Sequence, residues 1–443
     1  MPNLLSHSGT NLKRIYFESY GCAANRFDLE VMLGILAAAG YSFVTEPKSA
    51  DIILVHTCGV KKATEDKILH RLKLLSSLRK PTIVSGCLPK IDFEAMMRAS
   101  PNAAFLDPNS IHKILTAIDS LRDGGPKIFF SSRPPIKPSL PRFRLNKLIG
   151  VVQVAEGCLG DCSYCCTKLA RGELVSYPPE HILRNVKEAL EEGALEIWLT
   201  GQDLGAYGKD IGTNLIDLVE KVAALPYDFK VRLGMMNPSF ALEAINGLKR
   251  VYLNEKVYKF AHLPVQSGSD SVLKEMNRPY TVEEFKWVVE ELREEVDDIS
   301  IATDVIVGYP TETDEDFKAT LNLLKEVKPD ITNVSKYAHR PKTKASLIPQ
   351  LSSTLVAERS RILSKLSSRI ALERNVRLVG RRETALITEK SSMGSYVGRI
   401  ANYKKVLVSS SKNLTRLKRI DVKIINATER YLIGSVNLGP NPA

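Results

Sequence analysis

The central fold of this 443-residue chain is indicated by the stretch Ile149-Gly150-Val151-Val152-Gln153-Val154-Ala155-Glu156-Gly157-Cys158-Leu159-Gly160-Asp161-Cys162-Ser163-Tyr164-Cys165. Residues 149–155 are mostly apolar and predict a buried strand. Three cysteines spaced C-x3-C-x2-C follow that strand directly. Thiolates on one loop can bind three irons of a 4Fe-4S cluster and leave the fourth iron open to another ligand. The spacing therefore favours a reactive cluster.

Zinc binding and simple packing account for these cysteines less well. Structural zinc generally takes four ligands, and no fourth Cys or His stands at a suitable spacing. Buried, unreactive cysteines are the plainest alternative, but they do not require this pattern. Cys166 stands beside Cys165 and would direct its sulfur elsewhere, so we interpret it as a small buried or half-exposed side chain.

The strand before the cysteine loop is the first of six strand-like runs in the middle of the chain. The others span residues 196–200, 230–235, 260–265, 300–307 and 333–338, and helical patterns such as 179–192 and 282–295 separate them. Six βα units are fewer than the eight of a complete barrel. We therefore expect an open, partial (β/α)6 barrel over residues 147–373.

A smaller α/β rhythm precedes the barrel and carries three more cysteines. Cys22, Cys58 and Cys87 each stand just past the end of a predicted strand, and each has a glycine neighbour. Each cysteine alone would be interpreted as packing. The carboxyl ends of parallel strands meet at one edge of a sheet, where ligands bind. The sequence thus predicts a parallel α/β domain at 11–125 with a second cluster, followed by a proline-rich linker at 126–146.

A basic segment follows the barrel. After a helical stretch at 354–375, the pattern changes to alternating strands at 384–388, 405–408, 422–425 and 431–436, which predicts a small β-barrel domain at 374–440. From residue 375 onward there are thirteen basic and four acidic residues, an excess of nine within a net charge of +12. This charge favours binding to RNA phosphates. The candidate contacts are Arg381, Arg382, Lys404, Lys405, Arg416, Lys418 and Arg419.

Composition limits the class of protein. With 44% hydrophobic and 25% charged residues, the chain is typical of a folded globular protein, and no window approaches a membrane span. No apolar leader precedes a small-residue cleavage site. We therefore expect a cytoplasmic protein without a membrane partner, whose seven cysteines are thiols or metal ligands rather than disulfides.

Together these motifs resemble the radical S-adenosylmethionine methylthiotransferase family. The resemblance rests on Tyr20-Gly21-Cys22-Ala23-Ala24-Asn25, His56-Thr57-Cys58, Ser85-Gly86-Cys87, the C-x3-C-x2-C loop and the basic β segment. It implies that Cys158, Cys162 and Cys165 hold a radical 4Fe-4S cluster. It also implies that Cys22, Cys58 and Cys87 hold an auxiliary 4Fe-4S cluster, and that the last segment is a TRAM RNA-binding domain. Two local departures are Lys342 and Thr311, which stand where the family commonly has glycine.

The resemblance also implies an S-adenosylmethionine site at the carboxyl ends of the barrel strands. Candidate contacts are Tyr164, Gln202, Asp203, Asn237 and Gln266, which lie in the cysteine loop or directly after strands. The alternative is that they are ordinary turn residues.

Residues 196–200, 205–215 and 232–235 resemble the archaeal and eukaryotic subgroup of these methylthiotransferases. This similarity indicates the substrate. It implies insertion of a methylthio group at C2 of N6-threonylcarbamoyladenosine next to the anticodon of tRNA, with an electron donor and a sulfur source as further partners. The threonylcarbamoyl group ends in a carboxylate, and Arg232 and Arg340 are candidate cations for it. Both arginines would otherwise pair with neighbouring acids.

Three alternatives stay open. The substrate would be isopentenyladenosine in tRNA if the pocket is apolar. It would be an aspartate of a ribosomal protein if the basic segment does not bind RNA. A non-catalytic iron-sulfur RNA-binding protein would need no cofactor loops.

Overall fold

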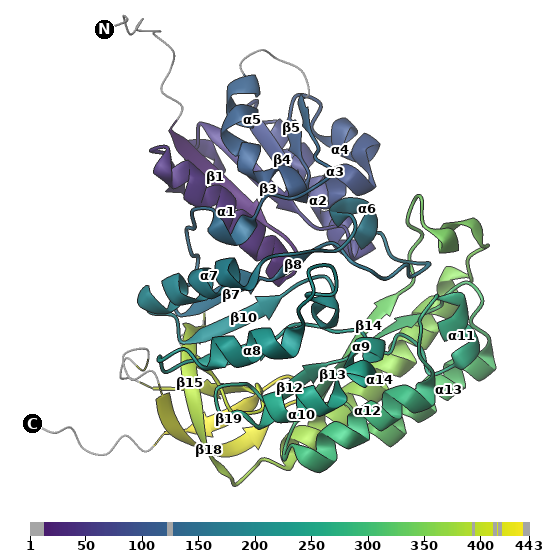
Figure 1. Ribbon diagram of the computed structural model, residues 1–443. Coiled ribbons are helices and arrows are strands. Elements are labelled where there is room, and N and C mark those ends of the chain that lie inside the picture. The colour runs from purple at the N-terminus through teal and green to yellow at the C-terminus, as the bar shows by residue number, and fades with distance from the viewer. Residues whose placement is uncertain (1–12, 122–126, 392–394, 411–413, 415–418, 437–443) are drawn as a thin grey trace, which may run out of the picture. The chain divides into compact units, whose positions relative to one another are not determined.

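The computed structural model describes residues 13–121, 127–391, 395–410, 414 and 419–436 (Figure 1). The chain divides into two compact units. The first runs to Arg144 and includes Leu169–Arg171, and the second comprises the remaining residues. Each unit is described by itself.

The first unit is a parallel six-stranded sheet with the strand order β2-β1-β3-β4-β5-β6. Its central strands β3 (Ile52–Thr57) and β4 (Thr82–Gly86) are buried along their whole length, as expected for a parallel sheet covered on both faces. The other strands are β1 (Arg14–Ser19), β2 (Ser42–Val44), β5 (Ala104–Leu106) and β6 (Lys127–Phe129), and the helices are α1 (Ala23–Ala38), α2 (Lys62–Ser76), α3 (Leu88–Ile91), α4 (Phe93–Ala99) and α5 (Ile114–Ser120). The predicted parallel α/β sheet is confirmed.

The segment predicted as a linker, residues 126–146, is part of this unit up to Arg144. It contributes β6 to the sheet, and the backbone N–H of Phe143 donates to the carbonyl of Glu30 at 2.9 Å. Lys137 is fully buried, with its Nζ 2.7 Å from Asp28 Oδ1. The prolines of this segment interrupt helices and strands, but they do not prevent its side chains from packing against residues far away in the sequence.

The second unit begins with the six expected parallel strands. They form two ladders, β11-β10-β7 and β12-β13-β14, and isolated bridges such as Met235↔His262 connect them. The strands are β7 (Ile149–Gln153), β10 (Glu196–Thr200), β11 (Lys230–Leu233), β12 (Phe260–His262), β13 (Ser300–Val307) and β14 (Ile331–Lys336). The helices along this part of the chain are α6 (Thr167–Arg171), α7 (Pro179–Glu191), α8 (Leu215–Ala223), α9 (Pro238–Glu243), α10 (Ile245–Leu253), α11 (Asp270–Glu275), α12 (Val282–Glu295) and α13 (Asp314–Val327). The predicted partial barrel is confirmed.

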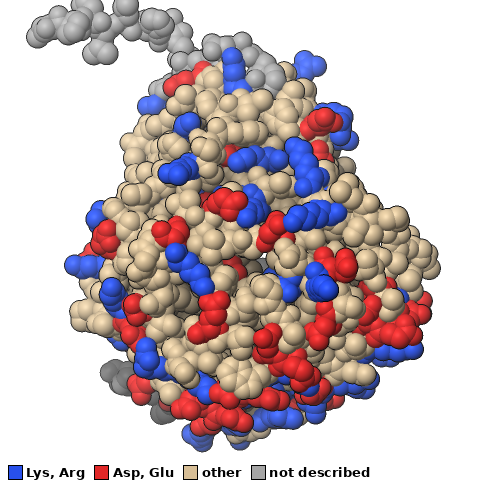
Figure 2. All heavy atoms as spheres, turned by 45° about the vertical axis from the view of Figure 1, so that its right-hand side comes forward, with Lys and Arg blue, Asp and Glu red and all other residues tan. Residues whose placement is uncertain are grey.

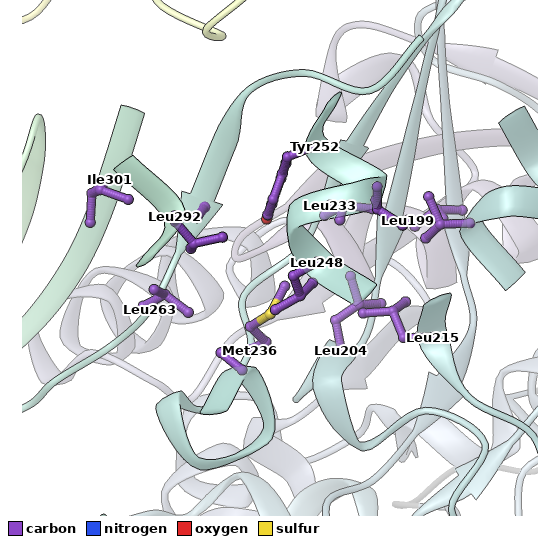
Figure 3. Close-up of a cluster of buried hydrophobic side chains, with 14 of the residues drawn as sticks. Leu199, Leu204, Leu215, Leu233, Met236, Leu248, Tyr252, Leu263, Leu292 and Ile301 are labelled. Atoms are coloured by element: carbon purple, nitrogen blue, oxygen red, sulfur yellow. The ribbon is translucent and has the colours of Figure 1, made fainter. Parts of the chain in front are cut away.

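Successive side chains along these strands alternate between an apolar core beneath the helices and the interior face of the barrel. Leu199 and Leu233 pack with Leu215 of α8 and Leu248 of α10 in a large apolar core (Figure 3). Since successive side chains of a strand point to opposite faces, the residues between these core positions face the interior of the barrel. Trp198, Arg232 and Asp304 occupy such positions. The interior face is therefore aromatic and polar.

The second unit ends in a closed five-stranded barrel with the order β15-β16-β17-β19-β18. Helix α14 (Ser353–Val376) packs against β14 and leads into it. The strands are β15 (Arg382–Lys390), β16 (Tyr396–Arg399), β17 (Lys405–Val408), β18 (Arg419–Ala427) and β19 (Leu432–Ser435). The small β-barrel predicted from the period-two pattern is confirmed. No helix among the described residues is long and apolar enough to cross a membrane.

Candidate metal centres and active site

Each sulfur of the C-x3-C-x2-C loop accepts an N–H hydrogen bond. The backbone N–H of Gly160 donates to Cys158 Sγ at 3.3 Å, and that of Thr167 donates to Cys165 Sγ at 3.4 Å. The Nη1 of Arg278 donates to Cys162 Sγ at 3.4 Å. Hydrogen bonds of this kind stabilise thiolates and tune the potential of iron-sulfur clusters. The three cysteines thus fit a 4Fe-4S cluster.

The space around Gly160 supports this fit. A Cβ atom there would lie 3.4 Å from Cys158 Sγ and 3.8 Å from Cys162 Sγ, so both sulfurs lie close to the glycine backbone. Within the described ranges, no three His, Cys, Asp or Glu side chains come together as ligands of a single metal ion. A 4Fe-4S cluster does not require its ligands to converge on one metal atom, because each cysteine binds a different iron.

The middle of the cysteine loop is anchored to the segment that ends α11. The N–H of Ser163 donates to the carbonyl of Met276 at 3.1 Å, and its hydroxyl donates to the carbonyl of Glu275 at 2.8 Å. The same hydroxyl is 2.9 Å from the hydroxyl of Tyr309. These contacts fix the backbone between Cys162 and Cys165.

Arg278 is a site residue that the sequence did not reveal. Its Nη2 donates to the carbonyl of Pro264 at 3.0 Å, and its Nε donates to the Tyr280 hydroxyl at 3.0 Å. Burial disfavours its charged form, but Tyr280, Tyr164 and Cys162 outweigh burial and raise the pKa of the guanidinium. Arg278 is therefore a fixed cation beside the loop. It reaches Cys162 across 116 residues, and no local pattern marks it.

The cysteines of the first unit converge at one edge of its sheet. Cys22, Cys58 and Cys87 follow β1, β3 and β4, which are neighbours in the sheet. The amide oxygen of Asn25 lies 3.8 Å from Cys22 Sγ and 3.9 Å from Cys87 Sγ. A Cβ on Gly21 would lie 2.9 Å from the Cβ of Cys58. The three side chains thus surround one small region, with Cys22 exposed and the other two buried.

Glycine is required at position 86 of this edge. Its φ is +99°, and a Cβ there would lie 2.2 Å from the carbonyl oxygen of Thr57. The N–H of the next residue, Cys87, donates to that carbonyl at 3.1 Å. The close approach of β3 and β4 thereby sets the position of Cys87.

Two of the candidate cofactor residues are brought together at the carboxyl ends of the barrel strands. Asp203 Oδ1 accepts from the N–H of Asn237 at 3.0 Å and from that of Gly205 at 3.2 Å. Burial raises the pKa of Asp203 to about 6. The side chain of Asn237 accepts from Ser239 N–H at 3.2 Å and caps α9, so it has the turn role considered as the alternative.

The other three candidates have different environments. Tyr164 packs against a small apolar cluster that contains Met276 and Tyr309. Gln266 has a positive φ of 71°, and its N–H donates to the carbonyl of Asp304 at 2.8 Å. The Oε1 of Gln202 is buried and has no hydrogen-bond partner among the described residues. These observations leave the cofactor contacts as predictions.

Arg232 lies among aromatic rings on the interior face of the barrel. Its guanidinium carbon is 5.5 Å from the ring centre of Phe260, 5.8 Å from that of Tyr403 and 6.0 Å from that of Trp198. In the described part of the chain it forms no ion pair, and its buried Nε has no hydrogen-bond partner. The alternative that Arg232 pairs with a neighbouring acid therefore does not hold. Arg340 lies in the turn after β14 and is buried.

Three polar residues that the sequence analysis missed occupy adjacent strands of the same face. His262 Nε2 is 3.0 Å from Asp304 Oδ2, and Asn333 Nδ2 donates to Asp304 Oδ1 at 2.7 Å. They stand on β12, β13 and β14. Polar residues at alternate positions of otherwise apolar strands are the signal that could have identified them.

Most described candidates for RNA binding in the C-terminal barrel are engaged with carboxylates of the same unit. Arg381 pairs with Asp298 at 2.6 Å, Lys404 pairs with the buried Asp330 at 2.7 Å, and Arg419 pairs with Asp228. Arg382 and Lys405 are exposed and form no ion pair with any described residue. Arg416 and Lys418 lie outside the described residues. Acidic and basic side chains are also intermixed on the face drawn in Figure 2.

Comparison with known proteins identifies the family. Residues 14–107 match the uncharacterized protein family UPF0004, residues 152–324 the Radical SAM superfamily, and residues 376–436 the TRAM domain. A probable threonylcarbamoyladenosine tRNA methylthiotransferase of Methanothermobacter thermautotrophicus is 40% identical over 422 residues, which cover 95% of this chain and 99% of the relative. The chain belongs to the threonylcarbamoyladenosine tRNA methylthiotransferase family. A methylthiotransferase of Xenopus laevis is 36% identical over 431 residues, 95% of this chain and 77% of that protein.

Solved structures resemble this methylthiotransferase in fold. A radical S-adenosylmethionine methyltransferase of Kitasatospora setae, with cobalamin and a 4Fe-4S cluster bound, has a TM-score of 0.56 at 13% identity and covers 75% of this chain and 77% of its own. The cobalamin-dependent radical enzyme OxsB has a TM-score of 0.53 at 11% identity, over 81% of this chain and 56% of its own. Membership of the Radical SAM superfamily implies S-adenosylmethionine and a 4Fe-4S cluster, and the residues of the C-x3-C-x2-C loop fit that cluster.

Proposed function

We propose that this methylthiotransferase inserts a methylthio group at C2 of N6-threonylcarbamoyladenosine beside the anticodon of tRNA. The observation that carries the proposal is the relationship to proteins of that name over nearly the whole chain. The convergence of two separate cysteine triplets supports it, since the reaction must both activate an aromatic C–H bond and deliver sulfur.

Each triplet would hold one 4Fe-4S cluster. Cys158, Cys162 and Cys165 would leave one iron free for S-adenosylmethionine, and Cys22, Cys58 and Cys87 would hold the auxiliary cluster. When bound, these groups supply one-electron cleavage of the sulfonium and the sulfur that is transferred. The chain itself stabilises the thiolates by N–H donors and by the guanidinium of Arg278.

The S-adenosylmethionine site would lie at the carboxyl ends of the barrel strands. Tyr164 would pack against the adenine, and Gln202, Asp203, Asn237 and Gln266 would bind the polar parts of the cofactor. The buried, unpaired Oε1 of Gln202 supports its part, because a buried acceptor without a partner is costly.

Arg232 would bind the carboxylate of the threonylcarbamoyl group, with Arg340 as a second candidate. Three aromatic rings lie 5.5–6.0 Å from its guanidinium carbon, and a guanidinium forms charge-assisted hydrogen bonds with a carboxylate. The row of His262, Asp304 and Asn333 offers further donors and acceptors on the same face. An isopentenyl group has no polar atom to match this surface, so the geometry favours the threonylcarbamoyl substrate.

The partners follow from this chemistry. The C-terminal barrel would bind the tRNA anticodon stem-loop, with Arg382 and Lys405 among the described phosphate contacts. An electron donor must supply the electron for sulfonium cleavage, and a sulfur source must replace the transferred sulfur. We place this reaction in the cytoplasm.

The deciding experiment gives the anaerobically reconstituted enzyme matched tRNAs that bear either threonylcarbamoyladenosine or isopentenyladenosine. We expect a methylthio mass increment on the first tRNA alone, together with 5′-deoxyadenosine. An increment on the isopentenylated tRNA alone would overturn the substrate. Release of no 5′-deoxyadenosine would favour the non-catalytic RNA-binding alternative.

A further inference from the structure

A buried arginine of the first unit lies beside its cysteines. Arg171 groups with this unit although it follows the C-x3-C-x2-C loop in sequence, and only 2% of its surface is exposed. Its Nη2 donates to Asn25 Oδ1 at 2.9 Å and to Asp28 Oδ2 at 2.8 Å. Asn25 is the residue whose amide oxygen lies close to Cys22 and Cys87. The guanidinium is thus oriented by a side chain that contacts the sulfurs.

Arg171 also acts directly on a cysteine. Its side chain is within hydrogen-bond reach of the Cys87 sulfur, and the guanidinium places a positive charge beside it. A cation that favours a thiolate also favours any additional negative charge placed on the same sulfurs.

Ion pairing with Asp28 does not by itself account for this arginine. Asp28 is fully buried and already has a buried cationic partner, since Lys137 Nζ lies 2.7 Å from its Oδ1. Lys137 and Arg171 bind opposite carboxylate oxygens. Of the two cations, Arg171 is the one that reaches the Cys87 sulfur.

We propose that Arg171, oriented by Asn25 and Asp28, is a positioning residue that donates a hydrogen bond to the auxiliary cluster and raises its reduction potential. This inference rests on the second cluster of the proposed function. Reduction adds one electron to the cluster, the sulfurs become more negative, and a fixed donor and cation beside them stabilise that state. No proton has to move, because the guanidinium stays charged in both states.

The test uses the full chain with Cys158, Cys162 and Cys165 changed to Ala, so that only the auxiliary cluster can assemble. Iron is counted, and the potential of the cluster is measured by a dithionite titration followed by electron paramagnetic resonance. Adding Arg171→Gln should shift the equilibrium about tenfold toward the oxidised cluster, a fall of about 59 mV for one electron. Arg171→Lys keeps the charge and should give a smaller fall.

Lys137→Gln is the matched control. It disturbs the same buried carboxylate and should lower the melting temperature as Arg171→Gln does. It leaves the donor to Cys87 in place, so its potential should stay near that of the parent. A merely structural role for Arg171 would give equal potentials for the two variants.

The outcomes separate this inference from the function on which it rests. If the parent protein without the loop cysteines binds no iron, the second cluster itself is wrong. If the parent holds about four irons and Arg171→Gln leaves the potential unchanged, only the role of Arg171 is wrong. Should Arg171→Gln and Arg171→Lys both lose iron, retention of the parent's circular dichroism supports a role at the cluster. Loss of that signal makes Arg171 a structural residue and overturns the inference.

Discussion

At the scale of single residues, the two cysteine triplets share one feature beyond their sulfurs. Each has an arginine within hydrogen-bond reach of one cysteine: the partly buried Arg278 beside Cys162 and the buried Arg171 beside Cys87. Both arginines are held by additional acceptors, so their positions are set before any cluster is bound. Preorganised cations of this kind lower the cost of placing anionic clusters in a protein interior.

Arg232 provides the prediction at this scale. Arg232→Met should raise the KM for threonylcarbamoylated tRNA about 10- to 100-fold, because a charge-assisted hydrogen bond to a buried carboxylate contributes about 1.5–3 kcal/mol. Arg232→Lys should recover part of the affinity, since it keeps a cation among the rings. Steady-state kinetics of methylthio formation measures both. Arg250→Gln is the control, as Arg250 is exposed and pairs with Glu220. An unchanged KM in Arg232→Met would remove this arginine from the substrate site.

At the scale of elements, the turn between β16 and β17 joins the C-terminal barrel to the core of the second unit. The ring of Tyr403 lies 4.9 Å from those of Tyr258 and Phe260, and its φ is 65°. Arg399 Nη1 lies 3.4 Å from the buried Glu196 of β10. The C-terminal barrel is thus packed against β10 and β12, the neighbours of the strand β11 that carries Arg232.

Asp330 is the buried carboxylate at this junction. Its Oδ1 lies 2.7 Å from Lys404 Nζ and 3.0 Å from Arg374 Nε, and its Oδ2 accepts from the N–H of Ile301 at 3.0 Å. Burial opposes its ionisation, but Lys404 and Arg374 outweigh burial and lower its pKa. One side chain therefore connects α14, β13 and the turn before β17.

Asp330→Asn should lower the free energy of unfolding by about 3 kcal/mol, since it leaves two partly buried cations without their buried charge partner. The difference from the wild type should be full above the unfolded-state pKa of about 3.9. It should shrink as the pH falls from there through the lower native pKa. Urea unfolding at several pH values measures it. The exposed Asp421→Asn is the control and should change stability by less than about 0.5 kcal/mol. Equal effects of the two substitutions would contradict the role given to Asp330.

At the scale of the whole molecule, a basic composition does not mean that every basic residue is available to RNA. Arg381, Lys404 and Arg419 pair with acids of the same unit, whereas Arg382 and Lys405 are exposed without a described ion-pair partner. The excess charge of the C-terminal segment thus serves two purposes. Part of it holds the barrel on the core, and part is presented to solvent.

This division predicts unequal effects on tRNA binding. Arg382→Gln and Lys405→Gln should each reduce the slope of log affinity against log salt by about one unit, because a complex with one fewer phosphate neutralised releases fewer counterions. Arg381→Gln and Arg419→Gln should change the slope much less. Filter binding of the anticodon stem-loop at several salt concentrations measures this. Equal slopes for all four variants would show that the ion pairs do not decide which residues bind RNA.

The sequence by itself determined the layered fold and the positions of the cysteines, since both depend on local patterns. Alternation and helical periodicity predicted the parallel sheet, the six strands of the partial barrel and the C-terminal β-barrel, and short spacing marked Cys158, Cys162 and Cys165. The ends of successive parallel strands meet at one edge, so Cys22, Cys58 and Cys87 could also be predicted to converge. The division at 11–125, 147–373 and 374–440 stays a prediction.

Only the tertiary structure decided which distant side chains meet. Arg278 reaches Cys162 across 116 residues, Arg171 reaches Asn25 across 146, and Arg419 reaches Asp228 across 191. Lys137 likewise reaches Asp28 across 109 residues, although it lies in a proline-rich stretch without periodic structure. A local pattern reports the face of an element on which a residue lies. The partner of that residue depends on how elements far apart in the sequence pack together, and no short-range spacing records it.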